Sequence, residues 1–268
     1  MKTPKILSGR LLADFIKERQ KNMVSSMTKK PTLLIIRDSD NPVIKKYVDL
    51  KIRYGEDIGI KVIDHKAKDS TDIKATIEKA NSDPEISGII LQLPILEKDQ
   101  TDTLTNLIAP EKDVDGLSNH GNYDSATATA ITWLLAGYDI NLKTQSIAIV
   151  GHGKLVGAPL YQMFLNSGYR VEIFDYGSDL TKLKEFDIII SATGQPGLIL
   201  DDYIKPGATL VDAGTASEDG VLKGDLAPEI RKRTDLTAIT PEIGGVGPLT
   251  IACLFDHVIR SHEKHAYF

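Results

Sequence analysis

The chain has 268 residues, which suits one large domain or two modest ones. Apolar residues make up 41% and charged residues 26% of the sequence, the balance of a folded globular protein rather than a disordered one. Lys and Arg number 32 against 37 Asp and Glu, so the formal net charge is −5, and this acidity argues against a nucleic-acid-binding protein. An anionic ligand stays possible, because backbone N–H groups hold phosphate without any net positive charge.

Short runs of branched apolar residues alternate with longer amphipathic stretches along the chain. Such runs are typical of strands buried on both faces of a sheet, and they lie at 33–36, 61–63, 88–91, 147–150, 171–174, 188–190 and 209–211. Helical patterns lie between or after them, at 43–58, 73–81, 126–136 and 248–262. This alternation predicts an α/β fold with parallel sheets and right-handed crossovers.

An irregular stretch rich in Pro, Gly and polar residues interrupts the alternation at 93–123. A fresh strand–helix–strand pattern then opens at Ile147. We therefore place a domain boundary near 125–144, where the first pattern has ended and the second has not begun.

Tyr47 and Lys51 stand four residues apart in the first long helical pattern, so they share one helix face. A phenol and an amine in one pocket can transfer protons, although a solvated pair on a helix surface has the same spacing. Gln92 interrupts an apolar strand and needs hydrogen-bond partners. Asp113 and Asp115 follow in a turn-rich stretch, where carboxylates serve either the turn or a ligand.

A glycine-rich turn follows the apolar run at 147–150 and opens a helical stretch. Gly151 would allow the tight turn, Gly153 would let the backbone approach a pyrophosphate, and Gly157 would allow close helix–strand contact. Asp175, at the end of the next strand, stands where an acid would accept the adenosine ribose hydroxyls of NAD. The alternatives are a simple tight turn and a solvated Asp.

The single cysteine excludes an internal disulfide framework and a multi-cysteine zinc site. Cys253 stands among apolar residues, so we expect a buried, unreactive thiol. Charges interrupt the first twenty residues, which therefore lack the apolar core of a signal peptide, and no run approaches the ~18 apolar residues of a membrane span. We expect a cytoplasmic protein with no bound metal and no membrane contact.

Taken together, these motifs resemble the bifunctional methylenetetrahydrofolate dehydrogenase/cyclohydrolase family. The match is collinear over most of the chain, and its order and spacing are highly specific. It comprises Tyr47-Val48-Asp49-Leu50-Lys51, Gly88 to Pro94 with Gln92, Lys112-Asp113-Val114-Asp115-Gly116, Val150-Gly151, Val156-Gly157-Ala158-Pro159, Ser191-Ala192-Thr193-Gly194, Lys223-Gly224-Asp225, Ile239-Thr240-Pro241 and Gly244-Gly245-Val246-Gly247-Pro248-Leu249-Thr250.

The resemblance implies an N-terminal α/β folate-binding domain at 1–125, completed by a C-terminal helix at 249–268. It implies a Rossmann-type dinucleotide-binding domain at 126–248, a cleft between the two domains, and a homodimer. The implied substrates are tetrahydrofolate derivatives of one-carbon metabolism. Methylenetetrahydrofolate would be oxidised to methenyltetrahydrofolate with NAD or NADP, and methenyltetrahydrofolate would be hydrolysed to 10-formyltetrahydrofolate.

The resemblance also assigns residues. Lys51 would be the acid–base group of the hydrolysis, Tyr47 its positioning partner and a ring that stacks on the pterin, and Gln92 a hydrogen-bond partner of Lys51. Asp115 would bind the polar edge of the pterin. Further substrate contacts would be Leu93, Gly244, Gly245 and Pro248, and further cofactor contacts would be His152, Tyr176, Thr193, Gly194 and Thr215 beside the three glycines and Asp175.

Several segments depart from the family pattern. The usual Pro-Cys-Thr-Pro reads Ser125-Ala126-Thr127-Ala128, and the Ser before the tyrosine reads Ile44. The Arg and Ser that help hold the 2′-phosphate in NADP-using members align with His152 and Tyr176, beside the acidic Asp175, so we expect NAD to be preferred. These departures keep three alternatives open: an enzyme with one of the two activities, a dehydrogenase of the same fold acting on another substrate such as shikimate, and a catalytically silent dinucleotide sensor.

Overall fold

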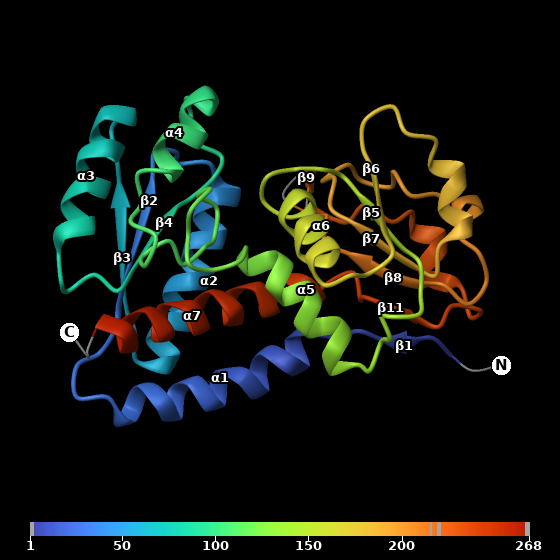
Figure 1. The fold of residues 1–268 in the computed structure, drawn as a ribbon, viewed down its shortest axis with the longest axis horizontal. Coiled ribbons are helices and arrows are strands. Elements are labelled where there is room, and N and C mark those ends of the chain that lie inside the picture. The colour runs from blue at the N-terminus through green and yellow to red at the C-terminus, as the bar shows by residue number, and fades with distance from the viewer. Residues whose placement is uncertain (1–2, 215, 219–220, 266–268) are drawn as a thin grey trace. The chain divides into compact units, whose positions relative to one another are not determined.

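The computed structural model describes residues 3–214, 216–218 and 221–265. The chain forms two compact units, one made of Met1–Ala13 with Thr127–Thr250 and the other of Asp14–Ala126 with Ile251–Phe268. Each unit has parallel strands with helices packed against them (Figure 1). This confirms the α/β architecture that the alternating pattern predicts.

The unit that contains Lys51 is built on a parallel sheet in the order β3-β2-β4. These strands are β2 (Thr32–Arg37), β3 (Lys61–Lys66) and β4 (Gly88–Leu91), and the helices of this part of the chain are α1 (Gly9–Ser26), α2 (Pro42–Ile58), α3 (Ser70–Ser82), α4 (Thr101–Thr105) and α7 (Val246–His265), with a 3₁₀ turn at Lys98–Gln100. The first residues of helices α1 and α7 belong to the other unit.

Helix α2 has clear start and stop signals. The Asn41 side chain accepts a hydrogen bond from the N–H of Val43 at 2.8 Å, Pro42 occupies the first turn, and Gly59 ends the helix with φ +83°. Its buried face consists of Ile44, Val48, Gly55 and Ile58. The orientation of this helix therefore follows from its apolar stripe, which leaves the opposite face free for polar residues.

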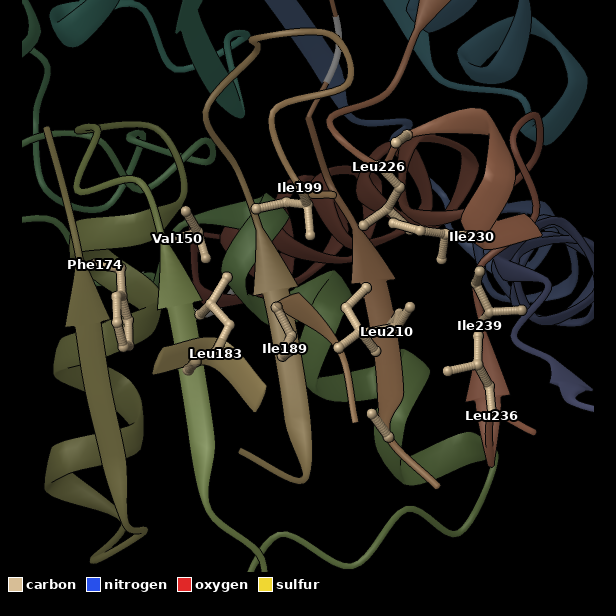
Figure 2. Close-up of a cluster of buried hydrophobic side chains, with 14 residues drawn as sticks. Val150, Phe174, Leu183, Ile189, Ile199, Leu210, Leu226, Ile230, Leu236 and Ile239 are labelled. Atoms are coloured by element: carbon tan, nitrogen blue, oxygen red, sulfur yellow. The ribbon is translucent and has the colours of Figure 1, made fainter. Parts of the chain in front are cut away.

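The second unit is built on a parallel sheet in the order β1-β11-β8-β7-β5-β6. Its strands are β1 (Lys5–Ile6), β5 (Ile147–Val150), β6 (Val171–Phe174), β7 (Ile188–Ser191), β8 (Thr209–Asp212) and β11 (Ala238–Ile239), with helices α5 (Ala126–Gly137) and α6 (Gly157–Asn166) and 3₁₀ turns at Leu180–Glu185, Asp201–Tyr203 and Pro228–Lys232. A short antiparallel pair joins β9 (Ala216–Glu218) to β10 (Val221–Lys223). Figure 2 shows the buried cluster running across the sheet from Phe174 on β6 to Ile239 on β11.

The expected division of the chain differs from the two units at its beginning. The first 13 residues pack with the dinucleotide-type unit rather than with the unit of 14–126. The reason is β1, which pairs in parallel with β11 so that Lys5 lies opposite Ala238 and Ile6 opposite Ile239. Near residue 126 and residue 250 the observed borders lie within two residues of the expected ones.

Cys253 is fully buried in α7, as expected, and burial raises the pKa of its thiol. Among the helices that the structure describes, none is both long enough and apolar enough to cross a bilayer.

Candidate active site

Lys51 and Gln92 meet at the carboxyl end of the three-stranded sheet. The Lys51 ammonium donates a hydrogen bond to Gln92 Oε1 at 2.6 Å. Gln92 Nε2 donates to the Leu93 carbonyl at 3.1 Å, so the amide oxygen is the atom that faces Lys51. The Gln92 N–H continues the β2–β4 ladder by donating to the Ile36 carbonyl at 2.8 Å. The partner of Lys51 is therefore held by both its backbone and its side chain.

Burial and charge act in opposite directions on the two ionisable groups of this site. Burial lowers the pKa of Lys51, and the Asp115 carboxylate opposes that shift. Burial raises the pKa of Asp115, with Lys51 opposing and Asp113 adding to the effect. Both residues keep part of their surface open to solvent, so a ligand can reach them. A lysine that loses its proton more easily than usual suits acid–base chemistry.

The loop before Asp115 shows which of its charged residues serve structure. The buried Lys112 ammonium donates at 2.7–2.9 Å to the carbonyls of Ala80, Asn81 and Asp83, at the end of α3. Asp113 is also buried, and its carboxylate accepts from the N–H groups of Gly116, Leu117 and Ser118. Asp113 is thus a turn carboxylate, while Asp115 is the acid that interacts with Lys51.

Tyr47 lies one helical turn before Lys51 on α2 and is half-buried. Within the described part of the chain, the Tyr47 hydroxyl has no protein hydrogen-bond partner. Its ring and hydroxyl are therefore available to a ligand. Ile44, one turn earlier, is buried in the apolar face of the helix and offers no polar group there.

The glycine-rich turn after β5 has the geometry of a phosphate-binding turn. Gly151 has φ +98°, and a Cβ built on Gly157 would lie 1.8 Å from the Gly151 carbonyl oxygen. A Cβ built on Gly153 would meet nothing within 4 Å, so the backbone is open at this point. The turn leads into the N-terminus of α6, where the partial positive charge of the helix suits the pyrophosphate of a dinucleotide.

The strand order reverses direction at the same turn. Strand β5 has β6 on one side and β7 on the other, which is the switch point at which open α/β sheets bind ligands. Thr193 and Gly194 lie in the loop after β7, and Asp175 and Tyr176 lie exposed after β6. His152 is exposed and places its ring edge-on to Tyr161, with centroids 6.2 Å apart. Thr215 lies outside the described residues.

The remaining expected substrate residues lie in and after the loop at 241–245. Gly244 has φ +85°, and its carbonyl accepts from the Arg10 N–H at 3.0 Å. A Cβ on Gly9 would lie 1.9 Å from the Gly245 carbonyl oxygen, so this loop packs closely on the start of α1. Pro248 is half-buried in the first turn of α7. The backbone conformation therefore favours glycine at 244, and the close approach of the Gly245 carbonyl requires glycine at 9.

Sequence reasoning did not single out Asp225, which lies beside the expected cofactor residue Thr193. The residue is fully buried, and its Oδ2 accepts from the Ser191 hydroxyl at 2.6 Å and from the Thr193 N–H at 2.7 Å. A Cβ built on Gly214 would lie 2.0 Å from Asp225 Oδ1. Asp225 thus connects the loops that follow β7 and β8. Asp225 stands in the Lys223-Gly224-Asp225 motif of the family resemblance. The neighbouring sequence did not indicate its partners Ser191 and Thr193, which lie more than 30 residues away.

Comparison with known proteins agrees with this geometry. The family model for the catalytic domain of tetrahydrofolate dehydrogenase/cyclohydrolase matches residues 7–115, and the model for the NAD(P)-binding domain of the same family matches residues 125–266. The chain belongs to the tetrahydrofolate dehydrogenase/cyclohydrolase family. The resemblance seen in the sequence motifs is therefore confirmed.

Members of the tetrahydrofolate dehydrogenase/cyclohydrolase family resemble the chain over nearly its whole length. The bifunctional protein FolD of Lactobacillus acidophilus is 36% identical, with 96% of each chain covered. That of Aquifex aeolicus is also 36% identical, over 97% of this chain and 95% of the relative. The crystal structure of the bifunctional FolD dehydrogenase/cyclohydrolase from Campylobacter jejuni has a TM-score of 0.90 at 30% identity and covers 97% of this chain and 99% of its own.

Proposed function

We propose that this chain oxidises methylenetetrahydrofolate to methenyltetrahydrofolate with a nicotinamide dinucleotide and hydrolyses methenyltetrahydrofolate to 10-formyltetrahydrofolate. The observation that carries the proposal is the Lys51–Gln92 hydrogen bond beside Asp115, in a chain of this family. The bound nicotinamide supplies the hydride acceptor. The chain's own contribution to that step is to bind and orient the ligands.

The hydrolysis is where side-chain chemistry enters. Water adds to the one-carbon bridge, which requires removal of a proton from the water and delivery of one to the departing folate nitrogen. Lys51, whose pKa burial lowers, would take the first proton and give the second. Gln92 Oε1 accepts an N–H from Lys51 in either protonation state, so it orients the amine throughout.

The folate would be held at the carboxyl end of the three-stranded sheet, where Lys51 and Gln92 meet. The Asp115 carboxylate accepts hydrogen bonds, and a pterin ring presents N–H donors along its polar edge. The Tyr47 ring, with a free hydroxyl, would stack on the pterin, and Leu93 would contact it. The dinucleotide would bind at Gly151, His152, Gly153, Gly157, Asp175, Tyr176, Thr193 and Gly194.

Substitution of Lys51 tests the proposed function. We expect Lys51→Met to lower the rate of methenyltetrahydrofolate hydrolysis by about 10²-fold or more, because the proton carrier is lost. Dinucleotide binding should be unchanged. The measurement is the decay of methenyl-folate absorbance, together with a dinucleotide binding titration. Lys46→Met, an exposed neighbour on the same helix, is the control and should hydrolyse at the wild-type rate. Undiminished hydrolysis by Lys51→Met would remove Lys51 from the mechanism.

An enzyme that retains only the dehydrogenase activity is the second candidate. Ile44 and Ala126, where the family pattern has Ser and Cys, are both buried and apolar. The candidate predicts NADH or NADPH formation from methylenetetrahydrofolate without accelerated decay of methenyltetrahydrofolate. Absence of both reactions would instead favour the silent sensor.

We also propose that the enzyme prefers NAD to NADP. Asp175 stands exposed at the end of β6, where a 2′-phosphate would meet its negative charge, and Tyr176 beside it is fully exposed and offers no cation. The expected result is a higher kcat/KM with NAD, and a smaller preference in Asp175→Ser. Glu172→Gln, an exposed acid on the same strand, should leave the ratio unchanged. A higher kcat/KM with NADP in the wild type would contradict the proposal.

We propose, finally, that the enzyme is a cytoplasmic homodimer, as in the family that it resembles. Sedimentation velocity should give about twice the mass of one chain, and cell fractionation should place the protein in the cytoplasm. A single-chain mass at micromolar concentration would rule out a stable dimer.

A further inference from the structure

Among the side chains of α7 that the structure describes, His257 and His262 bond to backbone carbonyls of other segments. The Nδ1 of His257 lies 2.9 Å from the Val114 carbonyl oxygen, and the Nε2 of His262 lies 2.9 Å from the Lys29 carbonyl oxygen. A carbonyl only accepts, so the ring nitrogen carries the proton in both cases. His257 is 6% exposed, and the carbonyl that it reaches is the one directly before Asp115.

The Val114 carbonyl belongs to the peptide that joins Val114 to Asp115. A hydrogen bond to that oxygen restrains the peptide plane from which the Asp115 side chain departs. The next peptide is restrained as well, because the Asp115 carbonyl accepts from the Ala126 N–H at 3.1 Å. The Asp115 backbone is therefore held on one side by α7 and on the other by the start of α5.

The His257 ring is itself fixed in orientation. Tyr123 stacks on it, with centroids 4.8 Å apart and an interplanar angle of 24°. Burial lowers the pKa of His257. The Val114 carbonyl, Asp256 and Asp124 favour its charged form, while Arg260 disfavours it. A stacked ring with one defined donor is a rigid support for the loop.

We propose that His257 is a positioning residue, which acts through the Val114–Asp115 peptide to set the Asp115 carboxylate for substrate binding. This inference rests on the folate-binding role proposed for Asp115. The mechanism of hydrolysis above does not use His257, and its position near the end of the sequence gives no hint of the contact. Its action is mechanical, since it fixes the geometry of a group that binds the pterin.

Steady-state kinetics with matched variants test the proposal. His257→Leu removes the donor and should raise the KM for methylenetetrahydrofolate by about tenfold. A change of this size corresponds to the loss of about one hydrogen bond between Asp115 and the substrate. The KM for the dinucleotide should stay within about twofold, because the glycine-rich turn keeps its own contacts. His257→Asn keeps an N–H close to the place of Nδ1 and should recover most of the loss. His257→Gln, whose amide reaches toward the place of Nε2, should not.

His262→Leu is the matched control, since it removes the ring-to-carbonyl bond at Lys29, together with the contact of His262 Nδ1 with the Ser87 hydroxyl at 3.0 Å, and leaves the Val114 carbonyl bonded. It should leave the folate KM unchanged. Equal changes in folate KM from His257→Leu and His262→Leu would overturn the proposal, as would a His257→Asn variant no better than His257→Gln. If His257→Leu does not fold, the comparison of Asn with Gln still decides.

A second readout separates this inference from the proposed function. The titration of the Asp115 carboxyl can be followed by ¹³C NMR in the ligand-free protein, with its signal assigned by Asp115→Asn. Its midpoint should shift in His257→Leu and not in His262→Leu. An unshifted midpoint would refute positioning by His257 even in an active folate enzyme. A wild type without folate turnover or binding would refute the proposed function, whatever the midpoint does.

Discussion

Lys51 and Asp115 each influence the charge state of the other. Burial disfavours the charged form of both, and each opposite charge partly restores it. Gln92 adds a neutral hydrogen bond that orients the amine without adding charge. The proton affinity of Lys51 therefore depends on Asp115 in a direction that can be measured.

We expect Asp115→Asn to move the hydrolysis to lower pH. The carboxylate raises the pKa of Lys51, so its removal lets that pKa fall further below the usual lysine range. The amine is active as a base only when unprotonated, and the rising limb of kcat against pH should shift toward acid. The measurement is kcat for methenyltetrahydrofolate hydrolysis at saturating substrate, from about pH 6 to 10.

Asp99→Asn controls for the general loss of a negative charge, since Asp99 is an exposed carboxylate in a 3₁₀ turn. Its profile should match that of the wild type. A limb that stays in place or moves toward alkaline pH in Asp115→Asn would show that Asp115 does not control the charge of Lys51.

Residue spacing predicted Tyr47 and Lys51 on one helix face, and the structure has both on α2. The same reasoning left Asp113 and Asp115 equivalent. What separates them is a set of three N–H groups that turn toward Asp113. The path of a folded loop determines these contacts, and the pattern of side chains does not encode it.

At the level of elements, the glycine-rich turn contains glycines required for two different reasons. The Gly151 carbonyl leaves no room for a side chain at position 157, whereas a side chain at position 153 would point into open space. A packing requirement and a ligand requirement can therefore be separated within one turn.

We expect Gly157→Ala to destabilise the protein by about 3 kcal/mol, because a methyl group 1.8 Å from a backbone oxygen forces the turn apart. Gly153→Ala should change the free energy of unfolding by less than about 1 kcal/mol and weaken dinucleotide binding instead. Urea unfolding and a dinucleotide titration measure the two effects. Equal destabilisation by both variants would contradict the separation.

Buried strands were the elements most fully predicted. The runs at 88–91 and 147–150 match β4 and β5 at both ends, because a strand covered on both faces is apolar throughout. The run at 171–174 also matches β6, an edge strand on which Glu172 is exposed. Helix α1 was missed, since Leu11 and Phe15 are exposed on it and charges interrupt its apolar positions. The two-residue strands β1 and β11 are too short to show any period.

For the whole molecule, β1 determines to which unit the start of the chain belongs. The Leu7 N–H donates to the Ile239 carbonyl at 2.9 Å, and the Leu7 side chain is fully buried. Tyr138 adds hydrogen bonds at the same place, where its hydroxyl accepts from the Ser8 N–H at 3.0 Å and donates to the Ser8 carbonyl at 3.1 Å. The N-terminal residues are thus part of the six-stranded unit.

Leu7→Ala should therefore destabilise that unit selectively, by about 2–5 kcal/mol. Hydrogen exchange should become faster at the amides of 209–212 and 238–239 and stay unchanged at 33–36 in β2. Leu11→Ala, at a position 67% exposed, is the control and should change neither. Faster exchange confined to β2 would place Leu7 with the other unit.

The sequence alone determined the α/β alternation, the glycine-rich turn and the helix that carries Tyr47 and Lys51. Each of these shows in a local pattern of apolar residues or glycines, because it depends on neighbours within about one helical turn or one strand. Tertiary structure alone decided the partners of Asp113, the place of β1, and the contact of His257 with Val114, 143 positions away. The contact of Lys51 with Gln92, 41 positions away, was implied only by the family resemblance, and no local pattern indicated it. Hydrogen bonds between distant segments form only where packing brings a donor to an acceptor, and no local pattern specifies that meeting.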